Sequence, residues 1–245
     1  MARCWRRVAR RRCAMPSRGP RRPASRGARN GTESSEAKRE ARKARRQEDR
    51  RAALLEAARE VLTQKGVGGL TMEAVAAAAD VSKPAVFYYF GTKEELMGAL
   101  AAGQLEAEVE VLLRAIAAAP DGVEALVALL RAKVDFYADD LDAFRVAYLW
   151  PQLIGIPPEV LRERVYPASQ RVSEALEARL KVDAREGRLA PGFEPRRLAN
   201  LVWITAHGLL SLVAGMQQVG GATRHTLTQL RDEACLLLRR ARLEG

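Results

Sequence analysis

The chain has 245 residues, of which 48% are hydrophobic and 29% charged, and its formal net charge is +11. This length is sufficient to bury a hydrophobic core without disulfide or metal cross-links. The three cysteines, at positions 4, 13 and 235, make no disulfide framework, and neither histidine has a metal-ligating neighbour at suitable spacing. The sequence contains no uninterrupted run of about 18 apolar residues, so we expect no membrane-spanning segment and no membrane partner.

The apolar residues are mostly Ala, Leu and Val, which favour helices, and aromatic residues make up only 5% of the chain. No stretch alternates polar and apolar residues for long enough to predict a strand. We therefore predict an all-α protein of about nine helices.

The positive charge is concentrated at the N-terminus. Residues 1–50 hold 18 Lys and Arg against 5 Asp and Glu, whereas residues 51–245 hold 23 against 25. The first 35 residues are rich in Arg, Pro, Gly and Ser and cannot bury enough surface to offset the entropy of ordering. We predict a disordered basic arm over residues 1–46, which becomes rich in helix formers from Ser35 onward. Such an arm is attracted to polyanions, most commonly nucleic acid.

Two alternatives for the first residues stay open. Met15 is an alternative translation start, in which case the preceding residues would not belong to the protein. An Arg-rich start without acidic residues is also typical of a mitochondrial transit peptide. Our prediction is a cytoplasmic protein with free thiols.

The first helix is predicted to begin near residue 51 and to end at Gly66, because glycine is favoured just past a helix C-terminus. Apolar residues recur along it at the spacing of one buried face. This predicted face consists of Leu54, Ala58, Val61 and Leu62.

Two short helices separated by a tight turn follow the first helix. Thr71 is predicted to cap the first of them. Ser82 is predicted to cap the second, which carries Pro84 in its first turn and ends at Gly91. Two short helices that are joined by a tight turn and braced by a third helix are typical of a helix-turn-helix. We therefore predict a helix-turn-helix domain over residues 47–96.

Four consecutive aromatic residues, at positions 87–90, lie in the second short helix. Consecutive helical residues point about 100° apart, so one helix cannot bury all four. The predicted inner face consists of Val86, Tyr89 and Phe90. Phe87 and Tyr88 are then exposed beside Lys83, and such a surface suits DNA, because a tyrosine hydroxyl reaches phosphate and a ring covers sugar or a thymine methyl group. An ordinary helical corner with a buried aromatic cluster is the alternative.

The run GGLTMEAVAAAADVSKPAVFYYFGTKEELM, residues 68–97, resembles the N-terminal signature of the TetR family of bacterial transcriptional regulators. The positions that fall on the family pattern in register are Thr71, Val75, Ala76, Ala79, Val81, Ser82, Val86, Tyr89, Phe90, Lys93 and Leu96. The resemblance implies a three-helix DNA-binding domain, followed by C-terminal helices that dimerise and hold a small-molecule pocket.

The resemblance also implies which residues contact DNA. The DNA-facing set that it implies is Thr71, Ser82, Lys83, Pro84, Phe87, Tyr88 and Lys93. Within this set, Lys83, Pro84 and Tyr88 are expected at base edges, whereas Thr71 and Lys93 are expected at the DNA backbone. Lys93 lies at the start of the next helix, where backbone N–H groups also attract phosphate.

Four positions depart from the family pattern. Asp80 stands where the family usually has Gly, and Asp tolerates a left-handed turn. Pro84 stands in place of Gly and Ala85 in place of a common Thr, which removes one hydroxyl. Phe87 stands in place of Tyr, which removes a phosphate hydrogen bond at that position. These departures affect the phosphate contacts and the operator sequence rather than the fold.

The segment 51–96 holds 5 Lys and Arg against 6 Asp and Glu, so it is not basic itself. The adjacent residues 36–50 are therefore expected to supply much of the attraction to DNA, along phosphates or through the minor groove. A solvated tail without a binding role is the alternative.

Residues 97–245 are predicted to form a helical domain that binds an effector and dimerises. Capping boxes are predicted at Thr92 with Glu95 and at Asp121 with Glu124. The helices predicted here are one to about residue 118, one from residue 122, a segment around LDAFRVAYLW that stops at Pro151, a long helix from about 157 to 186, and two final helices over 195–219 and 222–243.

The two final helices carry the predicted dimer interface. Small residues on the first of them allow the close approach of a second helix, and two such helices from each of two chains make a four-helix bundle. The predicted interface residues are Leu201, Gly208, Leu212, Gly215, Leu230 and Leu237. Covering the core of a monomer is the alternative role of these helices.

Aromatic residues of the C-terminal half and one histidine form the predicted effector-binding set: Phe136, Phe144, Tyr148, Trp150, Tyr166, Trp203 and His207. Packing in the core is the alternative role for each of these side chains. Few charges lie in the helix over 195–219, so the expected effector is largely apolar.

The sequence has no Gly-rich phosphate loop, no nucleophile elbow and no paired carboxylates in an apolar setting, so we expect neither an enzyme nor a cofactor. We predict a transcriptional regulator: a ligand-responsive repressor that binds a palindromic operator in double-stranded DNA as a homodimer. The alternative is a sequence-nonspecific nucleic-acid-binding protein driven by the basic arm.

Overall fold

The computed structural model describes residues 30–156 and 158–242. These residues form nine helices when α and π segments that follow one another directly are counted as one helix. Within the same ranges the only β pairing is an isolated bridge between Leu189 and Arg242. The prediction of an all-α protein is therefore confirmed. The chain divides into two compact units, which we call the N-terminal unit, up to Lys93, and the C-terminal unit, from Glu94.

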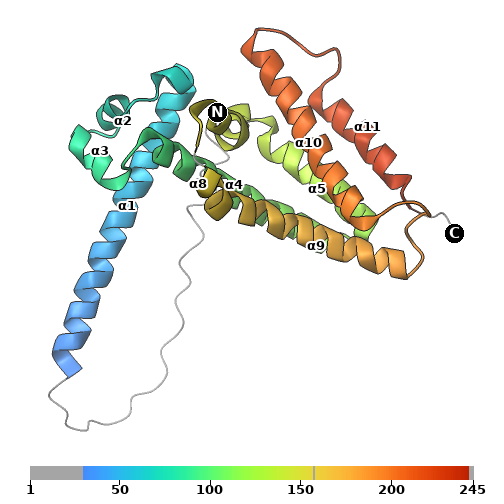
Figure 1. The fold of residues 1–245 in the computed structure, drawn as a ribbon, viewed down its shortest axis with the longest axis horizontal. Helices are drawn as coiled ribbons and strands as arrows, with labels where there is room; N and C mark the ends of the chain where they lie inside the picture. The colour runs from blue at the N-terminus through green and yellow to red at the C-terminus, as the bar shows by residue number, and fades with distance from the viewer. Residues whose placement is uncertain (1–29, 157, 243–245) are drawn as a thin grey trace. The chain divides into compact units, whose positions relative to one another are not determined.

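The N-terminal unit consists of α1 (Asn30–Gly69), α2 (Met72–Ala78) and α3 (Lys83–Tyr89). The second half of α1 packs against α2, and α2 packs against α3 (Figure 1). The buried face of α1 includes the four residues that the helical spacing predicted, Leu54, Ala58, Val61 and Leu62. At Gly66 the backbone leaves helical geometry, with φ 67° and ψ −173°, so the predicted helix end is a kink with another short turn after it.

The start of α1 differs from our prediction. Residues 30–46, which we expected to belong to a disordered arm, lie in α1. From Ser35 the segment consists largely of Ala, Glu, Lys, Arg and Gln, which have high helix propensity. The packed second half of the helix supplies the nucleus from which helical turns extend. The remaining residues of the predicted arm, 1–29, lie outside the described ranges.

Two of the three local features predicted around the turn between α2 and α3 are present, and the side-chain cap of α3 is absent. The Thr71 hydroxyl accepts a hydrogen bond from the N–H of Ala74 at 3.1 Å and so caps α2. Asp80 has φ 52°, the left-handed conformation that this residue type tolerates. Ser82 occupies the N-cap position of α3, but its side chain makes no capping hydrogen bond.

The C-terminal unit is built from longer helices connected by short turns. In chain order they are α4 (Lys93–Ala118), α5 (Gly122–Ala138), α6 (Leu141–Phe144), η2 (Arg145–Leu149), α7 (Trp150–Ile154), α8 (Pro158–Val160), η3 (Leu161–Val165), α9 (Tyr166–Arg185), α10 (Pro195–Gln218) and α11 (Leu227–Arg239). The predicted start of the last helix at residue 222 is wrong, because Thr226 and Gln229 form a capping box that begins α11 at Leu227.

Two π-helical segments, η2 and η3, explain why prolines do not end these helices. Pro151 was predicted to stop its helix, yet it lies inside α7, two residues after η2. Pro167 stands in the same relation to η3. A proline has no N–H and its ring clashes with the carbonyl group four residues earlier, and a wider turn relieves both problems.

Helix α5 is at the centre of the C-terminal unit and contacts α9, α10 and α11, and α10 and α11 also contact each other (Figure 1). One apolar core joins these helices with the C-terminal half of α4. Its side chains include Leu112, Leu126, Leu130, Leu176, Val202 and Leu238.

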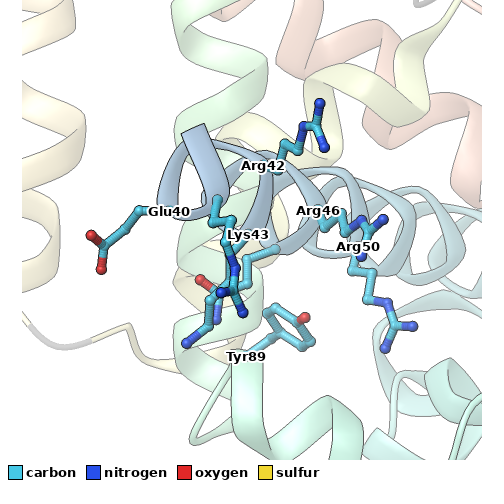
Figure 2. A pocket seen from close by; sticks show the side chains of 8 residues that line it. Glu40, Arg42, Lys43, Arg46, Arg50 and Tyr89 are labelled. Carbon is cyan, nitrogen blue, oxygen red and sulfur yellow. The ribbon is translucent and has the colours of Figure 1, made fainter. Parts of the chain in front are cut away.

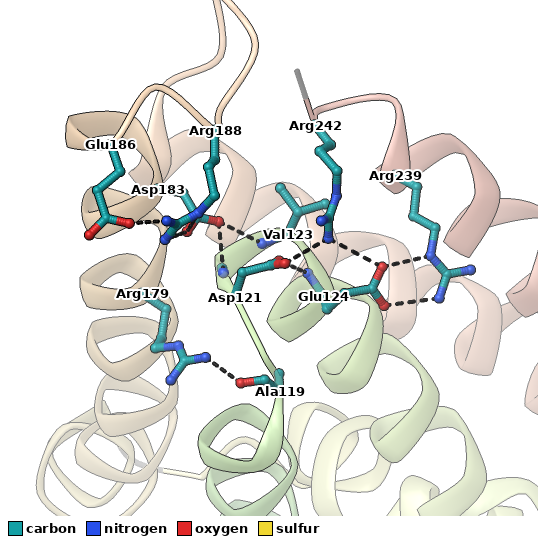
Figure 3. Close-up of polar contacts among 11 residues, drawn as sticks. Ala119, Asp121, Val123, Glu124, Arg179, Asp183, Glu186, Arg188, Arg239 and Arg242 are labelled. Atoms are coloured by element: carbon teal, nitrogen blue, oxygen red, sulfur yellow. Dashed lines mark hydrogen bonds and ion pairs between the residues drawn. The ribbon is translucent and has the colours of Figure 1, made fainter. Parts of the chain in front are cut away.

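A polar network fastens the N-terminus of α5 to the end of α9 (Figure 3). The buried carboxylate of Asp183 accepts hydrogen bonds from the N–H groups of Gly122 at 2.7 Å and Val123 at 3.1 Å. The same carboxylate pairs with Arg188. A Cβ at Gly122 would lie 2.8 Å from Asp183 Oδ2 and 2.9 Å from the carbonyl carbon of Arg179, so this close approach requires glycine.

Helix α10 is long and apolar enough to cross a membrane by length and composition alone, with a mean hydropathy of 1.5 over its best window. We expected no membrane-spanning segment because no uninterrupted run of about 18 apolar residues occurs, and Thr205, His207 and Ser211 interrupt the apolar sequence of this helix. The helix packs on α5, α9 and α11 through one face, and 33% of its most apolar window is buried.

Candidate DNA interface and buried polar cluster

Helix α3 buries one face and exposes the other, as its sequence predicts. Val86 and Phe90 are buried, and Tyr89 is partly buried. On the other face, Phe87 is 43% exposed and Tyr88 is 71% exposed. Two exposed rings on one short helix leave a large apolar surface in water, which indicates a binding surface.

Lys83, at the start of α3, lies between a carboxylate and a ring. Its ammonium group pairs with Glu73 of α2 and lies 5.6 Å from the centroid of the Phe87 ring. The hydrogen bond from Lys83 is the main cause that lowers the pKa of Glu73. Both side chains are well exposed, so a DNA phosphate or base can replace the carboxylate as the partner of Lys83.

The other predicted DNA-facing residues surround this face. Thr71, Ser82 and Pro84 are exposed, and the Thr71 hydroxyl retains its own proton for donation while it caps α2. Lys93, which we expected at the DNA backbone, already has one partner in the protein. Its ammonium group donates to the carbonyl oxygen of Val67 at 3.1 Å and so braces the end of α1.

A basic groove in the N-terminal unit lies between the extended start of α1 and α3 (Figure 2). It is lined by Arg39, Glu40, Arg42, Lys43, Arg46, Gln47, Arg50 and Tyr89. The pattern of the sequence indicated a basic segment here, but it did not predict a helical one, or that a ring from α3 would line it.

The C-terminal unit contains a buried ion pair between Glu108 of α4 and Lys133 of α5, both with no exposed side-chain surface. The hydroxyl of Tyr137 donates to Glu108 Oε2 at 2.6 Å, and that of Tyr148 donates to the same oxygen at 2.8 Å. Burial lowers the pKa of Lys133, and Glu108 opposes this effect. Burial and then the charge of Glu108 raise the pKa values of Tyr137 and Tyr148 well above 10.

Aromatic rings enclose this ion pair. The Lys133 ammonium lies 4.0 Å from the ring centroid of Trp203 and 4.3 Å from that of Tyr148, within cation–π range. The ring of His207 lies 4.9 Å from that of Tyr148 and 5.2 Å from that of Phe144. Among the residues that the structure describes, the buried Nδ1 atom of His207 has no hydrogen-bond partner. Burial, followed by the charge of Lys133, lowers the pKa of His207.

The structure brings most of the predicted effector-binding set together. Contacts link Phe136, Phe144, Tyr148, Trp203 and His207, directly or through Tyr137. Trp150 is buried, and Tyr166 is 56% exposed, and neither has a ring contact in this cluster among the described residues.

Sequence reasoning missed the two charges at the centre of the cluster, Glu108 and Lys133. Each lies at a buried helical position between apolar residues. A charged residue on the apolar face of a helix was the signal in the sequence that could have identified them, because a buried charge requires a partner.

The predicted dimer residues fall on an exposed apolar face of α10 and α11. Leu201 and Leu212 are about half exposed, and Leu237 is 67% exposed. Apart from the adjoining backbone of α10 itself, no described atom lies within 4 Å of a Cβ built at Gly208 or Gly215. Leu230 is partly buried. Further exposed apolar side chains extend this face, namely Ile204, Val219 and Leu236.

Within the described ranges, no group of three or more His, Cys, Asp or Glu side chains lies close enough together to hold a metal ion. Cys235 is a buried free thiol. Cys4 and Cys13 lie outside the described ranges.

Residues 54–100 match the sequence family of bacterial regulatory proteins of the tetR type. Over 187 residues the chain is 27% identical to the HTH-type transcriptional regulator RutR of Escherichia coli strain K12, covering 75% of this chain and 82% of RutR. Over 101 residues it is 31% identical to the HTH-type transcriptional activator FasR of Mycolicibacterium smegmatis, covering 41% of this chain and 46% of FasR.

Solved structures share the fold. The transcriptional regulator FadR from Bacillus subtilis, in complex with stearoyl-CoA, superimposes with a TM-score of 0.62 at 19% identity, covering 76% of this chain and 96% of FadR. The TetR family regulator PfmR from Thermus thermophilus gives 0.60 at 20% identity, covering 78% and 99%. The family match over residues 54–100, together with the curated relatives, shows that the chain is a DNA-binding transcriptional regulator with a helix-turn-helix domain of the TetR type.

Proposed function

We propose that this regulator is a ligand-responsive repressor that acts in the cytoplasm and binds a palindromic operator as a homodimer. The observation that carries the proposal is the outward face of α3, where Phe87 and Tyr88 are exposed beside Lys83. In the proposal, Lys83, Pro84 and Tyr88 contact base edges in the major groove. Thr71 and Lys93 contact the DNA backbone, and Ser82 and Phe87 complete the DNA-facing set.

The proposal of a homodimer is based on the exposed apolar face of α10 and α11. Six large apolar side chains of this face and its C-terminal extension are more than half exposed, which is a large cost in water unless a second chain covers them. They are Leu201, Ile204, Leu212, Val219, Leu236 and Leu237. A two-fold pair of chains would present two α3 helices about 34 Å apart, one turn of DNA, and would therefore bind a palindrome.

The effector site in this proposal is the aromatic cluster around Glu108 and Lys133. The fold relative FadR was solved in complex with stearoyl-CoA, which supports a small-molecule site in this chain as well. Glu108 lies on α4, and this helix begins at Lys93, the last residue of the N-terminal unit. Suppose that the protein has two states that differ in the position of α4 and in DNA affinity. An effector that binds one state more tightly than the other shifts the population towards that state, by an amount set by the ratio of its two affinities.

Selection of genomic DNA tests the proposal. The purified protein is mixed with sheared DNA from its own genome, and the retained fragments are sequenced. We expect an enriched palindrome whose half-sites lie about one or two helical turns apart, at about 10 base pairs per turn. Fragments without a common motif would favour the sequence-nonspecific binding protein instead.

The repressor role has its own test. Transcription from a promoter that overlaps the enriched palindrome should fall when the protein is added, and a ligand of the aromatic cluster should restore it. Stearoyl-CoA is the first probe, and a matched titration with coenzyme A distinguishes the acyl chain from the headgroup. Increased transcription on addition of the protein would show an activator.

A further inference from the structure

The extended start of α1 has a continuous cationic face. Arg39, Lys43, Arg46 and Arg50 follow one another at intervals of four, three and four residues, which places them on one side of the helix, and Arg42 lies at the edge of the same side. At about 1.5 Å per residue, this face is about 16 Å long. One strand of DNA carries four to five phosphates over that length, at about 3.4 Å per phosphate.

The cations of this face are not neutralised by the protein. Within the part of the chain that the structure describes, none of the five pairs with a carboxylate, and the single acidic residue of the groove is Glu40. Figure 2 shows the Glu40 carboxylate pointing away from the ring of Tyr89. Like charges four residues apart, such as Arg46 and Arg50, destabilise a helix, and a bound polyanion removes that cost.

Contacts inside the N-terminal unit hold this helix against α3. The side-chain amide of Gln47 donates to the hydroxyl of Tyr88 at 3.3 Å. The guanidinium group of Arg51 lies 5.0 Å from the ring centroid of Phe90. The cationic face and the exposed rings of α3 are therefore parts of one unit, and DNA that contacts α3 has its phosphates within reach of α1.

We propose that the cationic face of α1, together with Tyr89, is a second DNA contact that binds phosphate groups beside the base pairs contacted by α3. This inference rests on the proposed DNA binding and adds a site to it. The contact supplies affinity and salt dependence, because phosphates carry no sequence information.

Two double variants with the same charge change test the inference. Lys43→Gln/Arg50→Gln removes one lysine and one arginine from the groove. Lys38→Gln/Arg45→Gln removes the same residue types at the same spacing of seven residues, from exposed positions about 140° around the helix. Glutamine keeps the helix propensity, and circular dichroism with urea unfolding checks that both variants are folded.

The dissociation constant is measured by fluorescence anisotropy against salt concentration, with a selected genomic fragment and with a random-sequence duplex of about 30 base pairs, or three turns. For the groove variant we expect the slope of log Kd against log salt to fall by about 0.9 for each phosphate that the variant no longer binds, so by about 2 per chain. The control variant should change the slope by less than the value for one phosphate. The ratio of the two dissociation constants should stay as in the wild type.

The outcomes separate this inference from the proposed function. Suppose that the wild type prefers the selected fragment, and that the groove variant and the control variant have the same slope of log Kd against log salt. The second contact is then refuted while the DNA-binding function stands. A folded groove variant that loses the preference itself would also refute it. If the wild type binds neither duplex at low salt, the proposed function fails first.

Discussion

Replacing Lys133 with methionine tests the energetic role of the buried ion pair. The two side chains have similar volume, so the change removes the charge and preserves most of the packing. It leaves the carboxylate of Glu108 fully buried without a cation, although the hydroxyl groups of Tyr137 and Tyr148 continue to donate to it.

The size of the effect follows from these contacts. Removing one partner of a buried ion pair costs about 3–5 kcal/mol, because an uncompensated charge remains. Two hydroxyl donors still satisfy one carboxylate oxygen, so we expect the lower end, about 3 kcal/mol. At about 1.4 kcal/mol per factor of ten, this is a hundredfold change in the ratio of folded to unfolded protein.

Urea unfolding at one fixed protein concentration measures the change, since subunit association makes stability depend on concentration. The matched variant is Glu108→Gln/Lys133→Met, in which the glutamine oxygen can still accept from the tyrosines and no charge is buried. We expect this double variant to be more stable than the single variant Lys133→Met by about 2 kcal/mol. Additive losses from the two substitutions, or a loss below about 1 kcal/mol in Lys133→Met, would refute the reasoning.

Three further predictions concern other parts of the C-terminal unit. Gly122→Ala should lower the free energy of unfolding by about 1–3 kcal/mol in urea, because its Cβ would lie within 3 Å of neighbouring atoms; unchanged stability would contradict the close approach. Burial lowers the pKa of His207, so the stability that its neutral ring contributes is complete above about pH 6.5 and is lost as the pH falls towards the folded-state pKa. His207→Phe should flatten that acid limb of the unfolding free energy, and an unaltered pH profile would show that this residue does not cause it. Leu212→Glu/Leu237→Glu should yield monomers in analytical ultracentrifugation, whereas Leu153→Glu, on an exposed leucine outside α10 and α11, should leave the oligomeric state unchanged; dimers in both would place the interface elsewhere.

The sequence predicted α3 well because local rules decide its structure. The 100° step between helical residues separated the buried Val86 and Phe90 from the exposed Tyr88. Asp80 and Thr71 adopted the turn and cap conformations that their side chains favour. These features depend on neighbours within four residues, which is the range that sequence patterns cover.

The features that the sequence did not predict depend on distant partners or on competing local preferences. Glu108 and Lys133 are 25 residues apart, and no periodicity specifies that two buried charges will meet. Pro151 was predicted to end its helix, because the rule for proline does not include the wider π turn that accommodates it. The helical start of α1 was missed because its high charge favoured disorder, whereas its helix propensity and the packed turns after it favour helix.

The contact between α3 and base pairs is the central claim, and one ratio tests it most directly. The dissociation constant for the selected genomic fragment is divided by that for a shuffled duplex of the same composition, for the wild type and for folded Lys83→Ala/Tyr88→Ala. Each base contact contributes about 1–3 kcal/mol to discrimination between sequences. The account therefore predicts that the preference for the selected fragment is at least tenfold smaller in the variant than in the wild type. The dissociation constant of the variant for the shuffled duplex should stay within a few-fold of the wild-type value. A variant with the wild-type preference would contradict the account.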